Sequence, residues 1–75
     1  MKYIITANYE GTTSTVETDD IEILFQELRT HLGAPHICIG DGTTGEVLMH
    51  TGSEPYFAPG FMMLWMTWML PQFYD

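Results

Sequence analysis

The 75-residue chain is long enough for one small domain and too short for two, and 45% of its residues are hydrophobic. A chain of this size buries only about 60% of the surface that its unfolded form exposes, so one core is expected over residues 1–75. The apolar fraction also excludes a chain that cannot collapse. Ten Asp and Glu face only Lys2 and Arg29, which leaves a formal charge of −8 at pH 7.

This charge restricts the classes of partner. A strongly negative field repels phosphate backbones and anionic lipid headgroups, so direct binding to DNA, RNA or a cytoplasmic membrane leaflet is disfavoured. The partner that the charge favours is a basic protein surface, and the alternative is that acidity serves only solubility. Cys38 is the only cysteine, which excludes an internal disulfide and fits a reducing compartment. The N-terminal MKYIITANYE lacks the continuous apolar middle of a secretion signal, so a cytoplasmic protein is predicted.

Two strands joined by a turn are predicted at the start of the chain. From Tyr3 to Tyr9 every second side chain is apolar, with Ile4 as the exception. This period of two is typical of a strand with one buried face. A turn at Gly11 and Thr12 follows, and residues 13–18 are rich in β-branched side chains, so the pair predicts a β-hairpin.

An amphipathic helix is predicted to begin near Ile21. Asp19 and Asp20 precede it, and short acidic side chains suit the positive N-terminal end of a helix. Gly33 stands where a left-handed C-terminal cap is expected. The apolar residues that helical spacing places on one side are Ile21, Leu24, Phe25, Leu28 and Leu32.

A second hairpin is predicted from two short β-rich segments, HICIG at residues 36–40 and EVLMHT at residues 46–51. The intervening DGTTG has the glycines and the aspartate of a tight connection. A register slip of one residue would exchange the two faces of this hairpin. The pairs expected from a loop over residues 41–45 are Ile39 with Val47, Ile37 with Met49, Cys38 with Leu48, and His36 with His50.

A loop and a final helix are predicted for the C-terminal part. Residues 52–60 contain two prolines and two glycines, and FMMLWMTWML from Phe61 to Leu70 is apolar except for Thr67, with Pro71 ending the helix. Ten residues are about half of the ~20 that span a bilayer, so this is not a transmembrane helix. The elements together predict one α+β domain of order ββαββα. Two β-hairpins form a small antiparallel or mixed sheet, packed with one amphipathic helix and a C-terminal apolar helix.

The strongest group of potential metal ligands is His36, Cys38 and His50, which share one face of the predicted second hairpin. Zinc prefers such nitrogen and sulfur ligands, but a structural site normally has four at compact spacing. We interpret the three as a buried cysteine with partly exposed histidines and expect no metal or other cofactor. Ser14 and Ser53 lie in no nucleophile elbow, and GDGTTG joins two strands rather than opening a helix. The sequence therefore predicts no catalytic residues and no enzyme activity.

Two candidate interaction surfaces remain. Carboxylates concentrated in the first hairpin and helix could form one acidic patch that imitates a phosphate backbone and occupies a basic channel of another protein. The C-terminal helix is apolar around its circumference, which predicts a self-association or docking surface, and a homodimer. The acidic patch comprises Glu10, Glu17, Asp19, Asp20, Glu22 and Glu27. The docking surface comprises Phe61, Leu64, Trp65 and Trp68.

In length, acidity and its lone cysteine, without a catalytic motif, the chain is similar to small inhibitor proteins of phages and mobile elements, such as anti-CRISPR proteins. That resemblance implies a noncatalytic module that blocks a nucleic-acid-handling complex by binding it. The function predicted is an acidic protein-binding inhibitor or decoy. The alternative is a small structural or housekeeping domain whose acidity serves only solubility.

Overall fold

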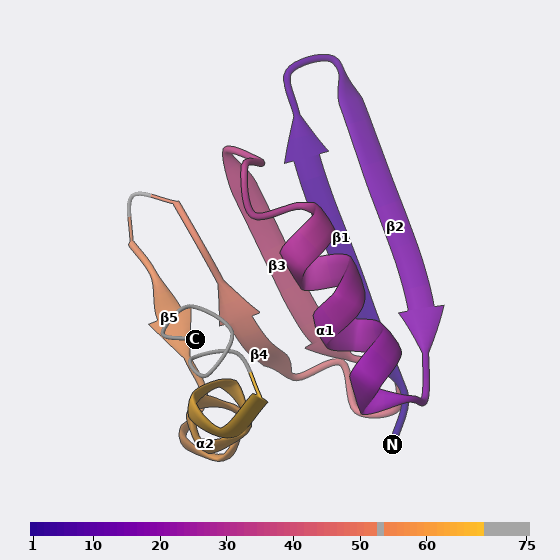
Figure 1. Cartoon of the computed structure of the whole chain (residues 1–75), viewed down its shortest axis with the longest axis vertical. Coiled ribbons are helices and arrows are strands. Elements are labelled where there is room, and N and C mark those ends of the chain that lie inside the picture. The colour runs from indigo at the N-terminus through magenta and orange to yellow at the C-terminus, as the bar shows by residue number, and fades with distance from the viewer. Residues whose placement is uncertain (53, 69–75) are drawn as a thin grey trace.

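Five strands form one antiparallel sheet in the order β2-β1-β3-β4-β5, accompanied by two helices (Figure 1). The computed structural model describes residues 1–52 and 54–68. The predicted α+β class is confirmed, and the ββαββα order holds apart from a fifth strand of two residues in the predicted loop. In chain order the elements are β1 (Tyr3–Tyr9), β2 (Thr12–Thr18), α1 (Ile21–Thr30), β3 (His36–Asp41), β4 (Val47–His50), β5 (Tyr56–Phe57) and α2 (Pro59–Trp68).

Both helices contribute to one hydrophobic core on a single face of the sheet. Figure 1 shows α1 lying over β1, and it contacts both β1 and β2, while α2 is seen end-on beside β4 and β5. The largest fully buried side chains come from both layers, because α1 supplies apolar residues at helical spacing and the strands supply them at alternate positions. These residues are Ile5, Leu24, Leu28, Ile39 and Met49.

The first hairpin has the predicted buried face and a slightly shifted turn. Tyr9 pairs with Thr12, so the turn consists of Glu10 and Gly11 rather than Gly11 and Thr12. Gly11 has a φ of 81°, in the left-handed region that glycine adopts without strain. Alternate residues of β1 are buried as expected, except that Tyr9 is exposed at the strand end.

Helix α1 begins as predicted and ends earlier. Asp20 is its N-cap, and its Oδ1 accepts a 2.8 Å hydrogen bond from the Glu22 amide. The predicted Gly33 cap is wrong, since Gly33 is not among the glycines of positive φ. The helix ends at Thr30, where the N–H of the C-cap residue His31 bonds to the carbonyls of both residue 27 and residue 28, which tightens the last turn. Leu32, predicted on the apolar face, therefore lies beyond the helix and is exposed.

The register predicted for the second hairpin is also wrong. Ile39 pairs with Met49 and Cys38 with His50, and the register shifts between Ile39 and Gly40. Gly40 pairs with Val47, so this β-bulge leaves Leu48 as the extra residue on β4. The adjacent side chains Leu48 and Met49 are consequently both buried, at 8% and 1% exposure.

Candidate functional site

Carboxylates gather at one end of the sheet, where β1 begins, β2 ends, β3 ends and β4 begins. The antiparallel register fixes this arrangement, since Tyr3 pairs with Thr18 on one side and with Asp41 on the other. Figure 1 shows the same end at the bottom of the view, with the N-terminus, the β2–α1 junction and α2 close to it. We call this region the acidic end, and its carboxylates outside the core are Glu17, Asp19, Asp20, Glu22 and Glu46.

The acidic patch predicted from the sequence is only partly brought together. Glu10 lies in the β1–β2 turn, at the opposite end of a seven-residue strand. Seven residues of strand span about 23 Å, so Glu10 cannot act with Asp19 on one small surface. Glu27 lies further along α1, where its Oε2 is 3.6 Å from His31 Nε2. Glu46 is not among the residues predicted for the patch, but it lies at the acidic end.

One carboxylate of the acidic end is neutralised locally. Lys2 Nζ lies 2.9 Å from Glu17 Oε1, and both side chains are about half exposed. The hydrogen bond to Glu17 raises the pKa of Lys2, and the charges of Glu17 and Asp19 add to the effect. This pairing leaves Asp19, Asp20, Glu22 and Glu46 as the carboxylates available to a partner, because no ion pair involves them among the described residues.

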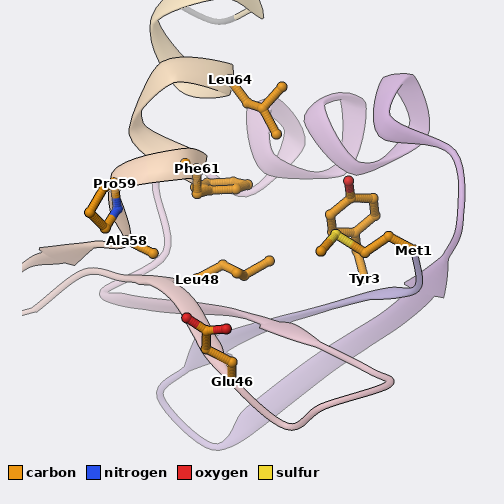
Figure 2. Close-up of a pocket in the computed structure, with 9 residues that line it drawn as sticks. Met1, Tyr3, Glu46, Leu48, Ala58, Pro59, Phe61 and Leu64 are labelled. Carbon is orange, nitrogen blue, oxygen red and sulfur yellow. The ribbon is translucent and has the colours of Figure 1, made fainter.

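A pocket of about 360 Å³ opens at the same end, between the starts of β1, β4 and α2. Figure 2 shows Phe61 and Leu64 of α2 on one side of it, Met1 and Tyr3 on the other, and Leu48 between them. Glu46 adds a carboxylate to the lining, which Ala58, Pro59 and Gly60 complete. The sequence pattern did not reveal this pocket, because the β4 bulge that places Leu48 there depends on strand pairing.

Asp41 holds the β3–β4 loop at the acidic end in shape. Its side chain is buried, and its Oδ1 accepts hydrogen bonds from the amides of Thr43, at 2.7 Å, and Thr44, at 3.2 Å. The Thr43 hydrogen bond is the main reason that the pKa of Asp41 lies below its ordinary value of 3.8. The segment GDGTTG is thus a turn closed by an aspartate, as predicted, and its Gly45 has a φ of 79°.

The lowered pKa predicts an acid dependence of stability. A carboxylate with a depressed pKa in the folded state stabilises the fold above its unfolded pKa, and this stabilisation disappears as the pH falls through the folded value. We expect the thermal midpoint of Asp41→Asn to lie below that of the wild type at pH 7, with the difference shrinking below about pH 4. Thermal unfolding followed by circular dichroism between about pH 2 and pH 7 measures it. A pH-independent difference would contradict this role of the charge.

The predicted docking surface is largely the inward face of α2. Phe61 is only 3% exposed and stacks on Phe25 of α1, with ring centroids 5.8 Å apart. Leu64 and Trp65 are half-buried against the core, and Trp68 is 37% exposed. Phe61 therefore belongs to the core and not to a docking surface. The i, i+3, i+4, i+7 spacing of the four predicted residues places them on one face of α2, and this face packs inward.

The outward face of α2 consists of methionines instead. Met62, Met63 and Met66 are 40%, 70% and 54% exposed. We call these three residues the methionine stripe. The end predicted for this helix, at Leu70 and Pro71, lies outside the described residues, as does Ser53. No helix in the described ranges is long and apolar enough to cross a membrane.

His36, Cys38 and His50 share the face of the sheet that points away from both helices, despite the changed register. The rings of His36 and His50 have centroids 6.3 Å apart, and His50 stacks on Tyr56 at 5.7 Å. Within the described residues, no group of three or more His, Cys, Asp or Glu is placed so that it could hold a metal ion. Cys38 is half-buried rather than fully buried.

This arrangement supports a prediction about metal. Purified protein should contain no stoichiometric zinc, because these three side chains do not form a closed site. A chelator should therefore leave its thermal midpoint unchanged, whereas removal of a structural zinc ion would lower it. Elemental analysis of the purified chain, with calorimetry before and after the chelator, measures both quantities. One zinc ion per chain that is lost in a His36→Ala, His50→Ala variant would overturn the prediction.

A second polar group, not foreseen from the sequence, links β1 to the end of α1. The Tyr9 hydroxyl lies 2.6 Å from His31 Nδ1, and the other ring nitrogen of His31 faces Glu27. An imidazole that is oriented by a carboxylate can act as a base and activate a neighbouring hydroxyl as a nucleophile. Here the hydroxyl belongs to an exposed tyrosine, and neither the pocket at the acidic end nor a smaller one beside Trp68 is lined by these residues. We therefore interpret the contacts among Tyr9, His31 and Glu27 as a structural link between β1 and the end of α1.

Comparison of the chain with protein-family models, with curated proteins and with solved structures found no match in any of the three.

Proposed function

We propose that this chain is a noncatalytic protein-binding module that engages a basic surface of another protein through its acidic end. The observation that supports the proposal is the grouping of Asp19, Asp20, Glu22 and Glu46 around one end of the sheet, next to an apolar pocket. Uncompensated charge of one sign accelerates association with a surface of the opposite sign and selects against acidic partners.

The partner class that we propose is a nucleic-acid-handling complex in the cytoplasm, for which the chain acts as an inhibitor or decoy. A basic channel that binds phosphates also attracts carboxylates held on a rigid body. Asp19 and Asp20 follow a strand, and Glu22 lies in the first turn of α1, so the backbone that carries these charges is fixed. The similarity of the chain in size and charge to phage inhibitors is consistent with this proposal.

We also propose that the chain forms a homodimer through the methionine stripe. Methionine side chains adapt to irregular contacts, and apolar residues exposed together on one helix face are costly in water. A twofold pair covers such a face with a second copy of itself. This dimer would leave the pocket accessible, because Leu64 and Phe61 face the opposite side of α2.

The test of the proposed function is a matched pair of triple variants. Asp19→Asn, Asp20→Asn, Glu22→Gln removes three charges at the acidic end, while Glu10→Gln, Glu27→Gln, Glu54→Gln removes three elsewhere. Asn keeps the N-cap at Asp20, so the fold should survive. With proteins captured from a host lysate, we expect the first variant to associate about tenfold more slowly at low salt and the second to change little.

The two outcomes separate the proposal from its alternative. Capture of a basic partner that weakens with salt and depends on the acidic end supports a binding module. Equal association rates for the wild type and both triple variants would show that the carboxylates serve only solubility, as in a structural or housekeeping domain.

A further inference from the structure

The pocket at the acidic end has the size and lining of a site for an apolar group. Its volume of about 360 Å³ lies near the lower bound of typical ligand pockets, about 300–1,000 Å³. Leu48 and Phe61 are core residues, so two of its walls are rigid. Met1 is 71% exposed and can adapt to what enters, as methionine side chains do at binding surfaces.

The charges around the pocket indicate which kind of group enters. Glu46 belongs to the lining itself. Tyr3, which also lines the pocket, pairs with Thr18, and Asp19 follows Thr18 just beyond the end of β2. Among the described residues, the cations at this end are Lys2 and the terminal ammonium of Met1, and six carboxylates outnumber them: Glu17, Asp19, Asp20, Glu22, Asp41 and Glu46. An apolar ligand with a phosphate or carboxylate would therefore be disfavoured, whereas lysine or arginine beside an apolar group would be attracted.

We propose that the pocket takes one aliphatic or aromatic side chain from a basic segment of the partner, with flanking cations paired to Glu46 and Asp19. The proposal rests on the function proposed above and adds the anchor that a charged surface lacks. Electrostatic attraction chiefly raises the association rate, while an apolar anchor buried in a pocket lowers the dissociation rate. The acidic end and the pocket thus serve different steps of one binding event.

The probe is a set of five-residue peptides, Lys-Arg-X-Arg-Lys, in which X is Leu, Trp or Ala, and a Glu-flanked peptide with Leu at the centre. Titrations followed by amide chemical shifts give both affinity and location. We expect the Leu and Trp peptides to bind about tenfold more tightly than the Ala peptide, because they bury more apolar surface. The shifts should include Tyr3, Leu48 and Leu64, and the Glu-flanked peptide should not bind.

Two variants with one control locate the site further. Glu46→Gln should weaken the Leu peptide severalfold, while Glu54→Gln, which removes the same charge outside the pocket, should not. Gly60→Leu should abolish the preference for Leu over Ala without loss of fold, because a Cβ on Gly60 meets no atom within 4 Å. Circular dichroism checks the fold of all three.

Each other outcome contradicts the proposal that the pocket binds an apolar side chain from a basic segment. Equal binding of the Leu and Ala peptides, with shifts only at Asp19, Asp20 and Glu22, removes the pocket but leaves the charged surface as the site of function. Binding of the Glu-flanked peptide shows a pocket for apolar groups irrespective of charge. If no peptide binds, the proposal for the pocket is wrong. The proposed function is then tested independently by the association kinetics of the triple variants.

Discussion

Phe25→Ala should destabilise this domain strongly, because the Phe25 ring joins its two helices. Phe25 is 2% exposed and stacks on Phe61 at 5.8 Å and on Trp68 at 6.4 Å, both of which belong to α2. Loss of a buried phenylalanine costs about 3–5 kcal/mol in free energy of unfolding. Native proteins have only about 5–15 kcal/mol in total, so a large fraction of the variant should be unfolded at physiological temperature.

Urea unfolding followed by circular dichroism and tryptophan fluorescence measures this loss. The matched control is Ile23→Ala on the same helix, since Ile23 is 42% exposed and its truncation should change the free energy of unfolding by no more than about 1 kcal/mol. Phe25→Leu keeps most of the volume and should cost about 1.5 kcal/mol or less. Similar losses for Phe25→Ala and Ile23→Ala would contradict the packing of α2 on α1.

The second large effect concerns assembly. We expect the wild-type chain to be a dimer at micromolar concentration and Met63→Glu to be a folded monomer. An unpaired carboxylate placed in an apolar contact costs several kcal/mol, which shifts the dimer dissociation constant more than about a hundredfold. Trp65→Glu should unfold the chain instead, because Trp65 packs edge-on against Phe57 of β5 with centroids 5.5 Å apart.

Sedimentation at low and high concentration, with circular dichroism of each variant, distinguishes these results. Ile23→Glu places the same charge at an exposed apolar position of the other helix and should remain dimeric. A wild-type chain that is monomeric at every concentration would remove the dimer. A dimer that persists in Met63→Glu would show that its contact lies elsewhere.

Local sequence patterns predicted most of the element boundaries. Alternation in β1 and helical spacing in α1 predicted most of the residues that these elements bury, with Tyr9 and Leu32 as the exceptions, since these patterns depend only on the geometry of one element. Errors arose where a boundary depends on hydrogen bonds several residues away, as at Gly33, or on pairing with another strand, as at Val47. Strand β5 has only two residues and is defined by its pairing with β4, so no periodicity could predict it.

The candidate site was less predictable than the fold. The sequence indicated an acidic first half, but the end of the sheet at which each carboxylate lies follows from strand direction, which separates Glu10 from Asp19. It also indicated an apolar C-terminal helix without distinguishing its faces. Aromatic residues bury more area than methionine, which is why Phe61 and Trp65 face the core and Met63 faces solvent.

Composition was enough to establish the acidity and the lone cysteine. Periodicity was enough to establish the α+β class and the amphipathic face of α1, because each of these patterns lies within one segment of the chain. Tertiary contacts were needed to set the register of β3 with β4, the bulge that buries Leu48, and the inward face of α2. They also bring Met1, Glu46 and Leu64 to the lining of one pocket. These features join segments distant in the chain, where burial of the largest apolar surface selects among arrangements that local patterns leave equivalent.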